Sequence, residues 1–165
     1  MKNGLIYLLA SLLVTACDPY KKSGSGPVRS TPEPVVTSVP VSNQAVNIAW
    51  LDSERLMPVL EMANEQHKPV FVVFFASWCA PCKVMEEEVF PQTDVFTYLN
   101  NHFLNFHTDF DSPAGRTIAD IYEVTQLPTV LFLDPQGIVL ERHVGMAVPS
   151  LLNTMGNSAL EKMKR

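Results

Sequence analysis

The fold is decided by residues 78–83, Trp-Cys-Ala-Pro-Cys-Lys, which lie between an apolar run at 70–76 and an acid-rich, helix-forming run at 84–89. A strand leading into Cys-x-x-Cys, with a helix that starts between the cysteines, brings two sulfur atoms close enough to form a disulfide. The first sulfur would lie at the helix N-terminus, where unpaired backbone N–H groups and the helix dipole favour a thiolate. The pattern therefore predicts a nucleophilic Cys79 and, one turn later, a more buried Cys82 that attacks it internally.

Composition limits the other classes of function. The chain has 165 residues, of which 47% are hydrophobic, enough for one domain with a core and additional segments. Its formal net charge of −5 and the lack of a basic patch argue against a nucleic-acid partner. Three cysteines, Cys17 and the pair at 79 and 82, are too few for a scaffold held by disulfides. No metal site is expected, because zinc needs four ligands and the histidines show no paired ligand spacing.

Residues 1–16 have the pattern of an export signal: Lys2, a nearly continuous apolar run at 5–14, and small residues before Cys17. The run is short for a membrane span, which needs about 20 residues, although a marginal transmembrane anchor with an incidental cysteine is the alternative. Residues 14–17, Val-Thr-Ala-Cys, resemble a bacterial lipobox, which implies a lipoprotein signal peptide at 1–16 and lipidation of Cys17. Asp18 resembles the inner-membrane retention signal of enterobacterial lipoproteins.

Residues 17–44 form a segment rich in proline and serine after the predicted lipidated cysteine. Repeated prolines exclude a helix and disfavour a strand, so a disordered, semi-extended linker is predicted. One alternative is a disordered segment that does not serve to extend the domain from the membrane. Another is an edge strand built from the valines at 35–41. The prolines lie at positions 19, 27, 32, 34 and 40.

Residues 45–165 are predicted to form one domain. Apolar periodicity and turn signals predict helices at 53–66, 81–89, 94–101, 114–124 and 149–164, and strands at 70–75, 103–110, 130–133 and 138–144. Ser53 is the expected N-cap of the first helix. Asp-Pro-Gln-Gly at 134–137 predicts a hairpin turn. Parallel strands joined by helices, followed by one hairpin, predict an α/β fold with a central mixed β-sheet flanked by helices on both faces.

Several of these elements together resemble the thioredoxin fold: the dithiol stretch, Leu-Pro-Thr at 127–129, and a glycine at 145 that ends a strand. Within that superfamily, the chain is most similar to periplasmic thiol:disulfide interchange proteins of the DsbD C-terminal type. The shared pattern is Phe-Phe-Ala-x-Trp-Cys-x-x-Cys-Lys, then Glu86, then Leu-Pro-Thr, and the resemblance covers roughly residues 53–155.

The resemblance implies that Cys79 is the attacking thiolate and Cys82 the resolving cysteine. Thioredoxins commonly carry a buried aspartate six residues before the first cysteine, but Val73 occupies that position here. The proton acceptor for Cys82 must therefore differ, and Glu86, one turn further along the helix, is the candidate. A solvated helix charge is the alternative for Glu86, and His107 is predicted to be an ordinary surface or edge residue.

The resemblance also implies a substrate-binding groove. Pro128 would follow a cis peptide bond beside the disulfide, and Leu127 would offer its backbone N–H and C=O to an extended substrate segment, as in strand addition. Trp78 and Gly145 would border this groove.

Taken together, the resemblance implies a membrane-anchored, extracytoplasmic thiol–disulfide oxidoreductase in the bacterial cell envelope, on the inner membrane and facing the periplasm. Proline before the second cysteine favours a reductase. The expected substrates are disulfides of envelope proteins, and the protein is expected to be a monomer. Its only redox group would be the Cys79–Cys82 disulfide, with no cofactor, kept reduced by a membrane electron donor of the DsbD or CcdA type. A thiol oxidant or isomerase, and a non-catalytic binding or chaperone module that uses the groove at Pro128, are the alternatives.

Overall fold

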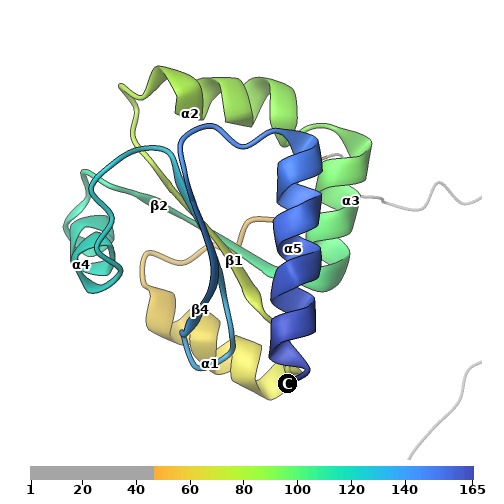
Figure 1. Ribbon diagram of the computed structural model, residues 1–165. Coiled ribbons are helices and arrows are strands. Elements are labelled where there is room, and N and C mark those ends of the chain that lie inside the picture. The colour runs from red at the N-terminus through yellow and green to blue at the C-terminus, as the bar shows by residue number, and fades with distance from the viewer. Residues whose placement is uncertain (1–46) are drawn as a thin grey trace, which may run out of the picture. The chain divides into compact units, whose positions relative to one another are not determined.

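The computed structural model describes residues 47–165 (Figure 1). The predicted order of helices and strands is confirmed in this part of the chain, whereas the signal peptide, Cys17 and the linker lie outside the described residues. The elements are α1 (Leu56–Gln66), β1 (Val70–Phe75), α2 (Ala80–Val84), η1 (Met85–Val89), α3 (Thr93–His102), β2 (Leu104–Asp109), α4 (Pro113–Ile121), β3 (Thr129–Leu133), β4 (Val139–Val144) and α5 (Pro149–Met163).

The strands form one mixed sheet in the order β2-β1-β3-β4. β1 pairs with β2 in parallel and with β3 antiparallel, and β3 pairs antiparallel with β4. The predicted mixed sheet is confirmed, but the implied parallel direction of β3 relative to β1 is wrong. The apolar runs of β1 and β3 predict only that both faces are covered, and that is true of either direction.

The core has two layers, one on each face of the sheet. Alternate β1 side chains, at positions 70, 72 and 74, pack with α1 and α4, whereas Phe71 and Val73 pack with η1, α3 and α5. Figure 1 shows α3 and α5 alongside each other on one side of the sheet and α4 on the other. β1 is buried along almost its whole length, which places the residues that follow it at a rigid strand end.

The first helix begins later than predicted. Its N-cap is Arg55, not Ser53, and Pro58 occupies the third helical position. Proline lacks an N–H and is tolerated within the first turn of a helix, so a start at residue 53 would have placed it too far inside. The Ser53 hydroxyl instead donates to the Arg55 carbonyl at 2.7 Å before the helix begins.

The helix after the dithiol is not uniform. A short α-helix, α2, continues into the π-helical turn η1, in which Phe90 N–H donates to the Met85 carbonyl at 2.9 Å. Met85 and Val89 are buried against the sheet, whereas the three glutamates between them are exposed. π-Helical turns are rare and are frequent at functional sites, and this one carries Glu86.

α4 begins in close contact with the end of β2. The Ser112 hydroxyl caps the helix by accepting a hydrogen bond from Gly115 N–H at 2.9 Å. A Cβ atom at Gly115 would lie 1.9 Å from the carbonyl oxygen of Asp109, which belongs to β2. Only glycine therefore fits this approach of helix to strand.

Gly115→Ala is expected to lower the free energy of unfolding by about 2–3 kcal/mol, because the backbone of β2 and α4 must separate to admit the methyl group. Urea denaturation would measure the loss. Thr117→Ala, an exposed change on the same helix, is the matched control and should stay within about 0.5 kcal/mol of the wild type. Equal stability of the Gly115 variant would contradict the close contact.

Candidate active site

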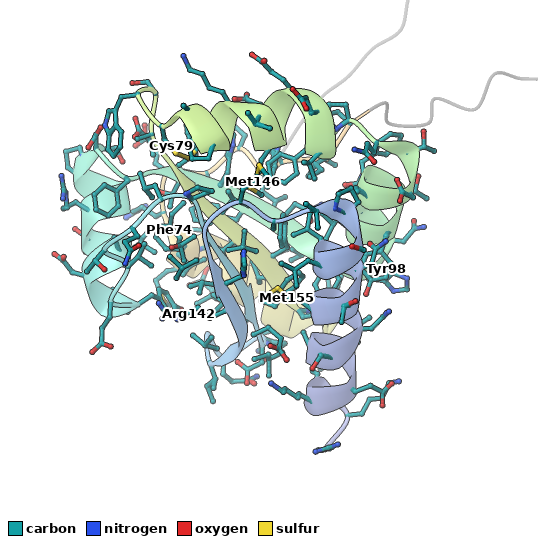
Figure 2. The ribbon with its side chains drawn as sticks, turned by 45° about the horizontal axis from the view of Figure 1, so that its top comes forward. Phe74, Cys79, Tyr98, Arg142, Met146 and Met155 are labelled. Atoms are coloured by element: carbon teal, nitrogen blue, oxygen red, sulfur yellow. A yellow bond between two sulfur atoms is a disulfide. The ribbon has the colours of Figure 1, made fainter. Side chains whose placement is uncertain are left out.

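The two cysteines lie at the start of α2 and form a disulfide, with their Cα atoms 5.3 Å apart. Cys79 is the N-cap residue, held by a hydrogen bond from its N–H to the Ala76 carbonyl at 3.0 Å. Its sulfur accepts a hydrogen bond from Cys82 N–H at 3.3 Å. Figure 2 shows Cys79 beneath the first turn of the helix. A backbone donor aimed at the first sulfur is an arrangement that stabilises a thiolate there.

The prediction that Cys82 is the more buried cysteine is wrong. Cys79 is 3% exposed and Cys82 is 7% exposed. Both pack with Ala76 in a small cluster that Phe75 and Leu127 cover in part. Cys82 keeps slightly more exposure because it also lines a pocket on the sheet side of the helix.

The Leu127–Pro128 peptide bond is cis, as the resemblance implies. The Pro128 carbonyl accepts a hydrogen bond from Gly145 N–H at 2.8 Å, which brings Gly145 to the site. Gly145 has φ of +101°, in the region that favours glycine, and no atom lies within 4 Å of a Cβ built on it. The backbone of Leu127 makes no hydrogen bond with any described residue, so its N–H and C=O stay available to an added strand.

Trp78 lies at the exposed rim of the site, with 66% of its surface accessible. Its indole N–H donates to the Asp111 carboxylate at 2.6 Å, and Arg116 lies 3.7 Å from the same carboxylate. Near Gly145, the half-exposed side chains of Met146 and Val148 add apolar surface. Figure 2 shows Met146 and Cys79 at the same end of the sheet. Of the predicted substrate-binding residues, Leu127 thus packs on the cysteine cluster and Pro128 lines a pocket with Cys82, while Gly145 is joined to the site through its hydrogen bond to Pro128.

A pocket of about 260 Å³ lies between the dithiol helix and the sheet. Its lining includes Cys82 and Glu86 from the helix, Val73 from β1, His107 from β2, and Trp50. The structure therefore places Glu86 and Cys82, the predicted resolving cysteine, on one cavity, and it shows that the apolar Val73 is buried there.

His107 is an exposed residue of the edge strand β2, as predicted, but its position on this pocket was not expected from the sequence. It is the register partner of Val73 in the parallel β1–β2 pair. Its ring stacks on Trp50, with centroids 4.8 Å apart and an interplanar angle of 5°, and it lies 5.3 Å from the Phe75 ring. Part of the residue remains exposed, but this aromatic cover lowers the pKa of His107, and the Glu86 carboxylate partly opposes the shift. The signal that could have found it is its register with Val73, which requires the strand pairing.

Two further types of site were searched in the described part of the chain. Within residues 47–165, no group of three or more His, Cys, Asp or Glu side chains could hold a metal ion. None of the helices there is long and apolar enough to cross a membrane. The Cys79–Cys82 disulfide is a group that takes up two electrons on reduction to the dithiol.

Comparisons with known proteins agree with this geometry. Residues 57–159 match the family model of the thioredoxin-like domain. Thiol:disulfide interchange protein DsbD of Colwellia psychrerythraea is 35% identical over 102 residues, which are 61% of this chain and 16% of that protein. Protein disulfide-isomerase 1 of Dictyostelium discoideum is 27% identical over 97 residues, 59% of this chain and 27% of that protein. The matched region thus spans a small part of these curated relatives.

Solved structures extend the likeness. A solution structure described as a disulphide-isomerase from Bacteroides thetaiotaomicron superposes with a TM-score of 0.58 and 34% identity, covering 70% of this chain and 95% of that one. The oxidised DsbD C-terminal domain of Neisseria meningitidis has a TM-score of 0.53 and 22% identity, covering 62% of this chain and 92% of that one, and supports the fold alone. The chain belongs to the thioredoxin-like family, and its relatives include thiol:disulfide interchange proteins of the DsbD type.

Proposed function

We propose that this protein is a reductase of protein disulfides, tethered by a lipid to the bacterial inner membrane and facing the periplasm. The observation that carries the redox part is the hydrogen bond from Cys82 N–H to the Cys79 sulfur, at the start of a helix and beside Pro128. The tether rests on the lipobox-like residues 14–17 and the proline-rich segment after them.

The reaction proceeds by two exchanges of disulfide partners. The Cys79 thiolate attacks one sulfur of the substrate disulfide, so that the substrate bond breaks, a mixed disulfide forms, and one substrate thiolate leaves and takes up a proton. Cys82 then loses its proton and attacks the Cys79 sulfur, which re-forms the Cys79–Cys82 disulfide and releases the second substrate thiol. The protein gives up two electrons and the substrate gains them, with no further cofactor.

The groove beside the disulfide supports an extended protein segment as the substrate. The free backbone N–H and C=O of Leu127 offer one donor and one acceptor to an added strand. Trp78 and Met146 provide exposed apolar surface for the bound segment, and the open space at Gly145 admits the incoming chain. Disulfides in envelope proteins are therefore the proposed substrates, bound by a monomer.

Direction follows from the same residues. Pro81 precedes the second cysteine. Strong oxidants have a histidine between the cysteines that stabilises the reduced form, and this chain has none there. A reductase in an oxidising compartment needs a continuing supply of electrons, so the proposed donor is a membrane protein of the DsbD or CcdA type.

The reduction potential of the Cys79–Cys82 pair is expected to lie closer to the thioredoxin value of about −270 mV than to the DsbA value of about −120 mV. Equilibration with glutathione buffers, read by thiol alkylation, would measure it. A value near that of DsbA would reverse the proposed direction. The complete failure of the reduced protein to cleave insulin disulfides would instead favour a binding module.

Cys82→Ser is expected to accumulate mixed disulfides, because the variant can attack through Cys79 but cannot resolve the product. Affinity purification from cells under non-reducing conditions, followed by mass spectrometry, would identify the captured proteins. Cys79→Ser is the matched control and should capture far fewer. Equal, empty purifications would count against protein disulfides as substrates.

Cys17→Ser is expected to move the protein from the membrane to the soluble fraction, because multiple acyl chains give stable anchoring and none would be attached. Detergent phase partitioning and cell fractionation would measure the change. Cys79→Ser keeps the predicted lipidation site and should remain in the membrane fraction. A Cys17 variant that stays with the membrane would contradict the proposed tether.

A further inference from the structure

The resolving step requires a proton acceptor near Cys82, and the pocket behind the disulfide holds two candidates. Val73 offers no acceptor, since it is apolar and 4% exposed. The two groups that can accept a proton and line the pocket together with Cys82 are the Glu86 carboxylate and the His107 imidazole. Glu86 comes from η1, which continues the dithiol helix, and His107 comes from β2.

General bases are most effective when their pKa lies near the working pH. Model thiols have a pKa of about 8.5, imidazoles about 6.5 and side-chain carboxyls about 4. Transfer from a thiol to an imidazole is therefore uphill by fewer pKa units than transfer to an ordinary carboxylate. On this ground histidine suits the role better than glutamate.

The position of His107 is fixed by more than its strand. Its ring stacks nearly parallel on Trp50 and also lies near the Phe75 ring, so one face of the imidazole is covered and the ring lines the pocket, although the residue as a whole remains exposed. Trp50 is itself tied to β2 by a bridge to Asn105 and packs edge-on against Phe90, which follows η1. Trp50 and Phe90 thus link β2, the strand that carries His107, to the end of the helix that begins at the dithiol.

The charged groups around His107 are few. The dithiol helix contributes Glu86 and Lys83, both on the pocket lining, and β2 itself contributes Asp109 two residues further along the strand. The packed faces of β1 and of the segment that carries Trp50 present only apolar and aromatic side chains to the pocket. Of these groups, Glu86 acts on the imidazole by charge, and it favours the protonated form.

We propose that His107 accepts the Cys82 proton during resolution through water in the pocket, and that Glu86 stabilises the imidazolium that forms. This inference rests on the proposed function, because it assigns a role within the second exchange. The pocket volume of about 260 Å³ has room for several waters, each of which occupies about 30 Å³ in the liquid.

The step balances as follows. The Cys82 S–H bond breaks and its proton passes through water to the imidazole, which leaves a Cys82 thiolate. The thiolate attacks the Cys79 sulfur, the Cys79–Cys82 bond forms, and the bond from Cys79 to the substrate sulfur breaks. The leaving thiolate then takes up a proton, and the imidazolium returns its own to solvent or to that thiolate. His107 therefore finishes in its starting state.

The two exchanges can be timed separately with dithiobis(nitrobenzoate), a small disulfide whose reduction releases the coloured thionitrobenzoate. Reduced protein releases one thionitrobenzoate when Cys79 attacks and a second when Cys82 resolves the mixed disulfide. Stopped-flow absorbance over a range of pH gives the rate of each phase. His107→Gln removes the base and keeps a side chain of similar size, and His102→Gln, on α3 and outside the pocket, is the matched control.

For His107→Gln we expect the second phase to slow by at least about 10-fold at pH 7, with the first phase changed less than about 2-fold. In the wild type, the plot of second-phase rate against pH should have its inflection below about 6.5, because the aromatic cover lowers the pKa of His107. In His107→Gln the inflection should move to near the ordinary thiol value of about 8.5. His102→Gln should match the wild type in both phases. Added imidazole should restore the second phase of His107→Ala, which a purely structural role for the ring would not predict.

Glu86→Gln distinguishes the two candidates. If Glu86 supports His107, its loss lowers the inflection of the second phase further, because the carboxylate no longer favours the imidazolium. Glu87→Gln, an exposed neighbour outside the pocket lining, should leave it in place. If Glu86 is itself the acceptor, Glu86→Gln moves the inflection toward the thiol value and His107→Gln does not, which overturns the proposal.

Failure of this inference differs from failure of the proposed function. A wild-type protein that gives both phases, with a pH profile that His107→Gln leaves unchanged, overturns the role of His107 and preserves the oxidoreductase. A wild-type protein that gives no second phase overturns both. Circular dichroism of each variant shows that a slowed phase does not arise from loss of the fold.

Discussion

The site depends on one contact, the hydrogen bond from Cys82 N–H to the Cys79 sulfur at 3.3 Å. It exists only because Cys79 is the last residue before a helix, where the first turn has N–H groups without helical partners. Pro81 suits that first turn because it has no N–H to satisfy. The helix must then lie flat on the sheet, which the buried Met85 and Val89 achieve.

The same constraint explains the apolar character of β1. The strand leads directly to the dithiol and is central in the sheet, so both of its faces are covered and Val73 is buried beneath the helix. A buried carboxylate at that position would carry a desolvation cost unless it was paired. With Val73 there, polar groups that face the pocket come from exposed places at its edge: the π-helical turn and the edge strand β2.

The order of the helices and strands and the position of the dithiol could be predicted because each rests on local sequence. The strand before the dithiol and the cap at Cys79 belong to short, continuous patterns, whereas the cis bond before Pro128 was implied by the resemblance to the thioredoxin fold. The direction of β3 and the place of His107 depend instead on pairing between distant strands, which no local pattern fixes. The helix was predicted to begin at Ser53 but begins at Leu56. Pro58 is tolerated within the first turn of a helix, and a start at Ser53 would have placed it beyond that turn.

The two sulfurs also face different surroundings, and this separates the two halves of the reaction in space. Leu127 packs on the cluster that contains both cysteines, and its backbone and the cis-linked Pro128 form the edge that would hold a substrate segment. Cys82 opens on the pocket that holds the ionisable side chains and does not include Cys79. The pocket also includes Pro128, so the proposed substrate edge and the proposed proton acceptors meet on either side of Cys82. A two-residue spacing at a helix start thus gives the two sulfurs different neighbours within one turn, a backbone N–H donor for Cys79 and a pocket with ionisable side chains for Cys82.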